Sequence, residues 1–313
     1  MSGIIVPICI RELEVPQISF TSAHTPRVAV AGATGRVGSA LISALSNDPI
    51  KLIALTRKPN PAHFASNVAQ ATVDFDNLST LRDALQGAER LFLAHGTSPR
   101  QAKNEIALID AAIDAGVRHI VKLSVFGPPL RLHPYDWHTH IESHLSTCEI
   151  GYTLLRPTTF FDVLALGGES IMKDTWGGAA GNGTVSLIDT RDIADCARAV
   201  LLDPNSNDYQ RAFHLTGEHA WSMPKIAEEL SFFLGRNVRY HHRSLAEHRK
   251  HLLSSGKNEL VTDVLVGLDL IVSQSVLSEN TSTVQVLTGH APRTLPAWLL
   301  ENIAMFGELA QER

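Results

Sequence analysis

The sequence predicts an α/β protein: a Rossmann-type, doubly wound parallel sheet with a smaller, mostly helical C-terminal substrate lobe. Three observations support this fold class. Short apolar runs alternate with amphipathic helical patterns as far as residue 157. A glycine-rich turn follows the first apolar run directly. Beyond residue 157 the regular alternation breaks, and the remainder is mostly amphipathic helix.

The first elements set the pattern. Residues 27–33, "RVAVAGA", form a β-branched run that ends in glycine, as a buried parallel strand does. Residues 35–47 then place apolar side chains at helical spacing. Further strands are expected at 50–57, 71–75, 90–96, 119–127 and 152–157, and further helices at 79–87, 101–116 and 140–148.

The later elements are less regular. Residues 177–201 hold a glycine-rich turn, a short strand and a helix that we expect Asp192 to open. A strand is expected at 211–217, and a helix at 222–235 with Ser222 as its N-cap. We therefore expect the following division of the chain: an N-terminal extension at 1–25, a Rossmann domain at 26–160 to which 185–209 return, and a lobe formed by 161–184 and 210–313.

Composition excludes several classes of protein. The 313 residues are 44% hydrophobic and 19% charged, which is typical of a soluble globular protein. A formal charge of −5 gives no general field for nucleic acid or an anionic membrane, and no run reaches the about 18 apolar residues of a membrane span. Cys9, Cys148 and Cys196 lie too far apart for a thiolate metal site, and their odd number indicates no disulfide framework. We expect a cytoplasmic monomer or homodimer.

The glycine turn predicts a dinucleotide site. Gly32, Gly35 and Gly38 lie between a predicted strand and a predicted helix, the context that gives the spacing its weight. Gly32 would form the tight turn, Gly35 would admit the pyrophosphate, and Gly38 would let the helix approach the strand. The helix N-terminus would face the phosphates with free N–H groups. The alternative is a glycine-rich turn that binds nothing. The cofactor-binding residues expected in this turn are Gly32, Thr34, Gly35, Arg36, Val37 and Gly38.

The end of the second strand predicts the type of cofactor. Thr56, Arg57 and Lys58 stand where an NAD-selective protein carries an acid for the ribose 2′-hydroxyl. An arginine can instead form a charge-assisted fork with a 2′-phosphate. We therefore expect NADPH to be preferred over NADH, although Arg57 and Lys58 are alternatively a solvated loop. Asp74 and Phe75 are expected beside the adenine, while Asp76 can cap the next helix.

Several longer segments carry a family resemblance. "VAVAGATGRVGSAL", "DAAIDAGVRHIVKLSVFG", "HIESHLSTCEIGYTLLRPTTFFDVL", "DTRDIADCARAVL" and "LTGHAPRTLPAWLLENIAMF" follow one another in the order expected of one family. Together they resemble the NmrA-like branch of the atypical short-chain dehydrogenase/reductases. The resemblance implies an NAD(P)-binding Rossmann domain and a small C-terminal substrate lobe. Members of this branch include quinone and dye reductases, and regulators that sense NADP without turnover.

The resemblance also assigns positions. It implies that Arg57 contacts the 2′-phosphate, and that Pro157 and Phe160 flank the nicotinamide. The family's usual asparagine at the position of Val163 is missing, so the hydrogen bond made by that amide is lost here. The remaining cofactor positions that the resemblance implies are Ala94, His95 and Gly96 at the end of one strand and Lys122 in the next.

The stretch "YDWHTHIESHL", residues 135–145, bears on catalysis. Ser124 is present, but the Tyr-x-x-x-Lys pair of short-chain reductases is missing. Counting back fourteen residues from Tyr152, to the position of an acid–base lysine in one subgroup, reaches His138. A histidine exchanges a proton near neutral pH, so His138 is our first candidate acid and Tyr135 the second. Ser124 is expected to hydrogen-bond a substrate carbonyl.

Other interpretations of the histidines are open. On a helix, His140 and His144 share a face, but a zinc site would need a third ligand from elsewhere, so no metal is expected. The histidines can also be plain surface or pocket-wall residues. The expected substrate-binding residues are Phe161, Trp176 and Trp137, although aromatic residues at such positions are often core.

The functional hypothesis is an NADPH-dependent reductase that transfers a hydride to an apolar conjugated or cyclic molecule, such as a quinone, an iminium or an enone, in secondary metabolism. With such acceptors, proximity and orientation drive the hydride step, and a dedicated acid is less necessary. Two alternatives stay open: a non-catalytic NADP(H)-sensing regulator, and a cofactor-binding cyclase or isomerase.

Overall fold

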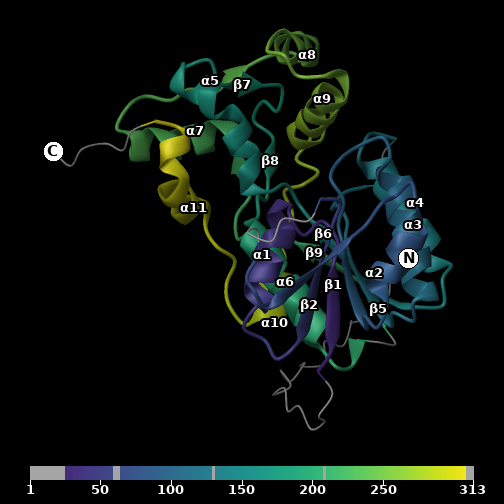
Figure 1. The fold of residues 1–313 in the computed structure, drawn as a ribbon. Coiled ribbons are helices and arrows are strands. Elements are labelled where there is room, and N and C mark those ends of the chain that lie inside the picture. The colour runs from purple at the N-terminus through teal and green to yellow at the C-terminus, as the bar shows by residue number, and fades with distance from the viewer. Residues whose placement is uncertain (1–24, 59–63, 129–130, 207–208, 308–313) are drawn as a thin grey trace, which may run out of the picture.

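A seven-stranded parallel sheet forms the centre of the protein (Figure 1). The computed structural model describes residues 25–58, 64–128, 131–206 and 209–307. The expected extension at 1–25 therefore lies almost wholly outside the described residues. The strands run in the order β3 (Val68–Thr72), β2 (Lys51–Thr56), β1 (Arg27–Val30), β4 (Arg90–Leu93), β5 (His119–Leu123), β6 (Gly151–Pro157) and β9 (Gln210–Leu215). This order is that of a Rossmann fold. Strands β2 and β3 lie on one side of β1, and β4 and the later strands lie on the other. Such folds bind their ligand at the point between β1 and β4 where the order switches sides.

Helices cover both faces of the sheet because alternate strand residues point to opposite sides. Val28 and Val30 belong to one buried cluster, and Ala29 and Ala31 to another. The first cluster lies under α1 (Arg36–Leu45), α6 (Thr190–Leu202) and α10 (Thr283–Thr288). The second lies under α2 (Ser79–Leu85), α3 (Gln101–Asp114) and α4 (Tyr135–Ser146).

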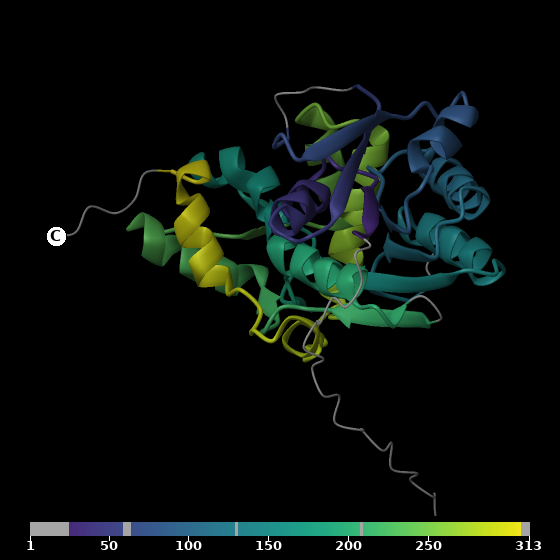
Figure 2. The same ribbon diagram turned by 60° about the horizontal axis from the view of Figure 1, so that its bottom comes forward.

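A smaller lobe lies beyond the carboxyl ends of the strands, and Figure 2 shows it beside the sheet from a second direction. It has its own buried cluster, which includes Phe161, Trp298 and Phe306. Its elements are η2 (Phe161–Gly167), α5 (Gly168–Met172), β7 (Gly177–Gly178), β8 (Thr184–Val185), β10 (Trp221–Ser222), α7 (Met223–Leu234), β11 (His241–His242), α8 (Leu245–Ser254), α9 (Glu259–Ser273), α11 (Leu295–Asn302) and η4 (Ile303–Met305).

Local capping explains where several lobe helices begin. The Ser222 hydroxyl accepts the Lys225 N–H at the start of α7, so the expected N-cap is confirmed. Ser244 and Glu247 form a reciprocal capping box at the start of α8. In the described part of the chain, no helix is both long and apolar enough to cross a membrane.

Several expected strands and helices end a few residues early in the structure, and four differences are larger or concern a cap or the lobe. The third strand lies at Val68–Thr72 rather than 71–75, because the chain turns at Asp74. The fourth helix begins at Tyr135 rather than 140, because Pro134 suits a helix start and the Tyr135 side chain is buried. Asp189, not Asp192, caps α6, since the Asp189 carboxylate accepts the Arg191 N–H.

The fourth difference concerns the lobe. The sequence places residues 210–215 in it, yet β9 pairs with β6 as the last strand of the main sheet. Helix α10 also packs on α6 and β9 rather than within the lobe. The connection from α6 to β9 is short, and β9 lies parallel to β6. The pattern of apolar residues along the chain does not show which sheet such a strand joins. We propose that the lobe consists of residues 161–184 with the parts of 216–307 outside α10.

Candidate active site

The glycine turn joins β1 to α1 at the carboxyl edge of the sheet. Gly32 has a φ of 70°, a conformation that favours glycine, and a Cβ there would lie 2.8 Å from the carbonyl oxygen of Ala94. The Gly35 N–H donates to the Gly32 carbonyl oxygen at 2.8 Å, which closes the turn. No side chain caps α1, so its first N–H groups stay available for an anion. The turn therefore fits the pyrophosphate of a dinucleotide.

Gly38 brings α1 against this turn. A Cβ on Gly38 would lie 2.2 Å from the Gly32 carbonyl oxygen, so only glycine permits the approach. Thr34 is exposed and Val37 is buried under the turn. Arg36, the other expected residue of the turn, forms an ion pair of 3.3 Å with Asp162 at the start of the lobe.

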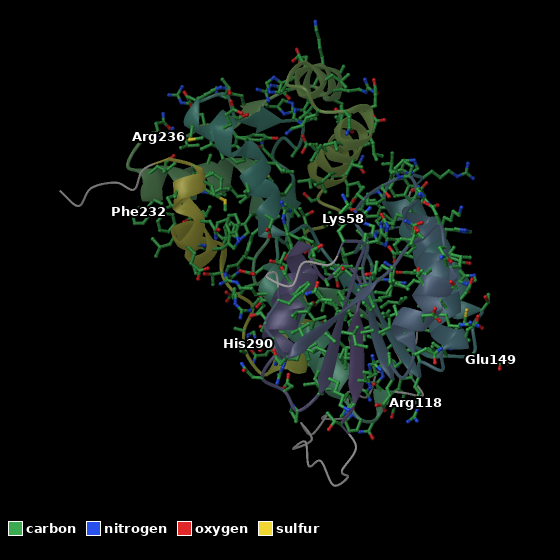
Figure 3. All side chains as sticks on the ribbon, viewed as in Figure 1. Lys58, Arg118, Glu149, Phe232, Arg236 and His290 are labelled. Carbon is green, nitrogen blue, oxygen red and sulfur yellow. The ribbon has the colours of Figure 1, made fainter. Side chains whose placement is uncertain are left out.

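Arg57 and Lys58 follow the end of β2, and both are exposed. Figure 3 shows Lys58 at the end of the sheet that faces the lobe, and Arg118 at the opposite end. The two cations that follow β2 are therefore on the ligand-binding edge, where a 2′-phosphate would need them.

Phe75 and His95 lie after β3 and β4, at the edge of the sheet where the sequence predicts the adenosine. The rings of Phe75 and His95 meet edge to face with centroids 5.8 Å apart. His95 Nδ1 lies 2.6 Å from the Gly96 carbonyl oxygen, and His95 Nε2 lies 3.0 Å from the Asn104 amide nitrogen. The ring of His95 is thus held by its neighbours at the edge of the site.

Asp74 and Asp76, in the turn between β3 and α2, have different partners. The Asp74 backbone N–H donates to the Thr80 hydroxyl at 2.8 Å, so Asp74 belongs to the turn that precedes α2. Asp76 does not cap α2, because its carboxylate pairs with the Arg100 guanidinium at 2.5 Å. This pairing lowers the pKa of the Asp76 carboxyl.

A buried ion pair lies under the carboxyl end of β5. Lys122 Nζ is 2.8 Å from a Glu105 carboxylate oxygen, and both side chains are 0% exposed. The same ammonium group also meets the Leu123 carbonyl oxygen and, at 3.1 Å, His138 Nδ1. The ammonium group is therefore enclosed by the protein. The sequence predicts a cofactor contact for Lys122, but its side chain has no exposed surface for a ligand.

Both ring nitrogens of His138 face polar side chains. Its Nδ1 accepts from the Lys122 ammonium, so a neutral imidazole carries its proton on Nε2, which lies 3.3 Å from the amide nitrogen of Gln101, the donor to Glu105. Burial and the Lys122 charge hold the pKa of His138 well below its usual value. The imidazole is therefore neutral near pH 7, and its two nitrogens face β5 and α3 in a half-buried residue.

Ser124 belongs to a second polar chain. Its hydroxyl donates to Glu142 Oε1 at 2.5 Å, and the Arg156 guanidinium binds the same carboxylate at 3.1 and 2.6 Å. The Glu142 carboxylate raises the pKa of Arg156 further. Because the single hydrogen of Ser124 is already donated, this hydroxyl group cannot also donate to a substrate carbonyl in this arrangement.

Tyr135 lies against Gly127, where a Cβ would meet the Tyr135 ring at 2.7 Å. The side chain is 7% exposed and belongs to the lobe's buried cluster. Burial raises the pKa of Tyr135 to about 12. The phenol is thus both shielded and a weaker acid than usual.

The other histidines of the stretch do not form a cluster. His140 is exposed, while His144 Nε2 pairs with Asp110 at 2.7 Å. Among the described residues, one group has metal-ligand spacing: Asp192, Asp195 and His290. The Arg293 guanidinium already binds both of those carboxylates, so the group is an ion-pair network.

The three residues expected to bind substrate lie in different parts of the structure. Trp176 lines a cavity of about 200 Å³ in the lobe. Phe161 is 1% exposed and packs against Trp298 in the lobe core, so it presents no surface to a ligand. Trp137 stacks on His133 with centroids 4.2 Å apart, and it is not part of the cavity wall.

Sequence reasoning missed several residues of the site. Glu142 lies one helical turn after His138 on α4, the i and i+4 spacing of the missing Tyr-x-x-x-Lys pair. The sequence spacing could therefore have pointed to Glu142. Nothing in the sequence pointed to Glu105 and Gln101 on α3, because only the fold brings α3 beside α4.

Comparisons with known proteins agree with this geometry. A family described as NAD(P)H-binding matches residues 32–204. Quinone oxidoreductase 2 of Escherichia coli (strain K12) is 30% identical over 277 residues, covering 86% of this chain and 96% of the relative. An NAD(P)H azoreductase of Xenophilus azovorans is 29% identical over 285 residues, covering 90% and 99%.

The structural comparisons lead to the same group. An NADPH-dependent quinone oxidoreductase of Escherichia coli, solved with NADPH, has a TM-score of 0.81 at 27% identity, covering 88% of this chain and 99% of that one. The regulator NmrA, solved with NAD, has a TM-score of 0.72 at 17% identity over 90% and 97%, which shows a shared fold. The resemblance and the fold class predicted from the sequence are confirmed.

Proposed function

Because this chain belongs to the NAD(P)H-binding family of NmrA-like Rossmann proteins and is an oxidoreductase, we propose that it is an NADPH-dependent reductase of quinone-type acceptors. One relative supports this substrate class by name, a quinone oxidoreductase, and a second is an NAD(P)H azoreductase. The glycine turn, the uncapped start of α1 and the two cations after β2 would hold the dinucleotide. When bound, the nicotinamide supplies the hydride.

One observation carries the proposal: none of the three expected catalytic residues is free to act as a general acid. The ring nitrogens of the neutral His138 face Lys122 and Gln101, Tyr135 is buried with its pKa raised to about 12, and the Ser124 hydrogen is held by Glu142. A ketone accepting a hydride becomes an alkoxide, a base of about hydroxide strength, and therefore needs an acid nearby. A quinone becomes a phenolate-type anion, whose conjugate acid has a pKa of about 10 as in tyrosine.

We therefore assign different roles to the polar residues. A quinone takes the hydride on one carbonyl oxygen and becomes the hydroquinone monoanion, whose phenolate oxygen then takes a proton from solvent. His138 orients the Lys122 ammonium, which holds α3 and α4 on β5 through Glu105. Arg156 and Glu142 fix the Ser124 side chain at the end of the same strand. These residues shape the floor of the site while the acceptor's own chemistry makes an enzyme acid unnecessary.

Replacing His138 by asparagine tests this assignment. We expect kcat with 1,4-naphthoquinone to fall by less than about fivefold, because loss of a true general acid costs about 10²- to 10⁴-fold. The pH profile of wild-type kcat/KM should show no limb in the usual range of histidine titration, since burial and the Lys122 charge hold the pKa of His138 well below its usual value. Steady-state oxidation of NADPH measures both.

His140→Asn, which changes an exposed histidine of the same helix, is the matched control and should behave as wild type. A loss of a hundredfold or more confined to His138→Asn, together with a histidine-dependent limb in the pH profile, would contradict the proposal.

Replacing Arg57 by alanine tests the cofactor. We expect kcat/KM for NADPH to fall about tenfold or more, as for a lost charge-assisted hydrogen bond, with little change for NADH. The ratio of the two values, measured with one quinone, reports the preference directly. Arg82→Ala removes an exposed arginine of α2 and is the control. Equal changes for NADPH and NADH would show that Arg57 does not bind the 2′-phosphate.

A further inference from the structure

The lobe contains a cavity that begins beside the expected position of the nicotinamide. Thr159 and Val163 form one part of its wall, and they directly follow β6, which ends at the ligand-binding edge of the sheet. Val163 occupies the position where the family usually has asparagine, so an apolar side chain lines the cavity at this point. The cavity is therefore a continuation of the active site into the lobe.

Apolar side chains form about half of the cavity wall, and polar or charged ones, among them Glu169, His251 and Lys257, form the rest. Leu164, Leu187 and Trp176 contribute from the segments around η2 and β8, and Leu265, Leu268 and Val272 from α9. Its volume of about 200 Å³ is below the roughly 300–1,000 Å³ typical of pockets for drug-sized ligands. The space thus suits a single ring of a larger molecule.

A polar group stands in this wall. The Ala179 N–H donates to a carboxylate oxygen of Asp269 at 2.5 Å, and the Ala180 N–H donates to the Tyr240 hydroxyl at 3.3 Å. His248 Nε2 lies 3.5 Å from the same Asp269 oxygen. The tyrosine and the aspartate both contact Gly178, where a Cβ would lie 2.6 Å from the Tyr240 oxygen and 2.5 Å from Asp269. Only glycine leaves room for this pair.

The Tyr240 hydroxyl is placed to donate. Its ring is fixed edge to face against Trp176, with centroids 5.1 Å apart. Burial and the nearby Asp269 raise its pKa, so the phenol keeps its proton. The hydroxyl oxygen accepts from Ala180, and within the described part of the chain no acceptor is found for the hydroxyl hydrogen. A ligand oxygen in the cavity would supply that acceptor.

We propose that this cavity binds one oxygen-bearing aromatic ring of the acceptor, with the Tyr240 hydroxyl donating a hydrogen bond to the ring's oxygen. The inference rests on the proposed quinone-type function and names the part of the lobe that selects among such acceptors. Two-ring acceptors with an oxygen on the ring distant from the reduced one fit the site best. Asp269 can accept from the same substituent when it is a hydroxyl group.

The test is the binding of 1-naphthol to the full chain, measured by calorimetry, because this ligand has the ring and the oxygen but cannot accept a hydride. Tyr240→Phe removes one oxygen atom, and we expect it to weaken binding about fivefold, as for one lost hydrogen bond. Leu268→Trp fills the cavity and should abolish binding. The matched controls are Tyr209→Phe, at the exposed start of β9, and Leu270→Trp, on α9 outside the cavity wall. Both should bind as wild type.

The outcomes separate the two proposals. If wild type reduces 1,4-naphthoquinone but 1-naphthol does not bind, or binds equally to Tyr240→Phe and Leu268→Trp, the cavity inference is wrong and the reductase function stands. If 1-naphthol binds with the expected dependence on Tyr240 but no quinone is reduced, the reductase function is wrong and the cavity remains an aromatic site. Should Leu268→Trp fail to fold, the Tyr240→Phe result decides.

Discussion

Gly38→Ala is expected to weaken NADPH binding by about a hundredfold or more, the cost of misplacing binding groups by about 1 Å. The new methyl group would lie 2.2 Å from the Gly32 carbonyl oxygen and 2.8 Å from its carbon, so α1 and the turn must separate. Gly32 cannot absorb the shift, because a Cβ at its own position would already lie 2.8 Å from the Ala94 carbonyl oxygen. Fluorescence titration of NADPH measures the effect.

Gly267→Ala is the matched control for that substitution. Gly267 is a buried glycine inside α9, and its Cβ would meet only Leu132 Cδ1, at an ordinary 3.8 Å. This variant should bind NADPH as wild type does. If Gly38→Ala keeps its NADPH affinity within about threefold of Gly267→Ala, the turn is not the phosphate site.

Lys122→Met is expected to have the largest effect on stability. Glu105 would remain fully buried without its cation, and removing one partner of a buried ion pair costs about 3–5 kcal/mol in free energy of unfolding. His138 would also lose the donor at its Nδ1 atom. Chemical denaturation, followed by circular dichroism, gives the free energy directly.

Two further variants separate the charge effect from packing. The double variant Lys122→Met with Glu105→Leu removes both charges and should recover most of the lost stability. Lys173→Met breaks the exposed pair with Glu169 and should leave the denaturation midpoint unchanged. A double variant as unstable as Lys122→Met would show that the pair contributes packing and not charge balance.

The features that could be predicted from the sequence are those that depend on residues close together in the chain. The glycine turn, the alternation of strands and helices and the position of Arg57 all depend on neighbours within a few residues. The glycine turn and the order of the strands and helices up to β6 appear in the structure as predicted, although the third strand and the fourth helix begin earlier than expected. The family match over residues 32–204 agrees with this part of the prediction.

The rest depends on contacts between distant residues. Glu105 meets Lys122 only because α3 packs on β5, and Arg156 meets Glu142 only because α4 packs on the same face of the sheet beside β6. The side chains around His138 come from both α3 and β5, so its neutral state was not visible in the pattern of histidines. The cavity beside Tyr240 likewise combines separate segments of the lobe.

The function assigned to this site is tested most directly by its choice of acceptor. Oxidation of NADPH by the wild-type protein should be measured with 1,4-naphthoquinone and with cyclohexanone at the same concentrations. We predict turnover with the quinone and a rate at least about a hundredfold lower with the ketone, because the ketone requires a general acid. Comparable turnover of both acceptors, or turnover of cyclohexanone alone, would contradict the account.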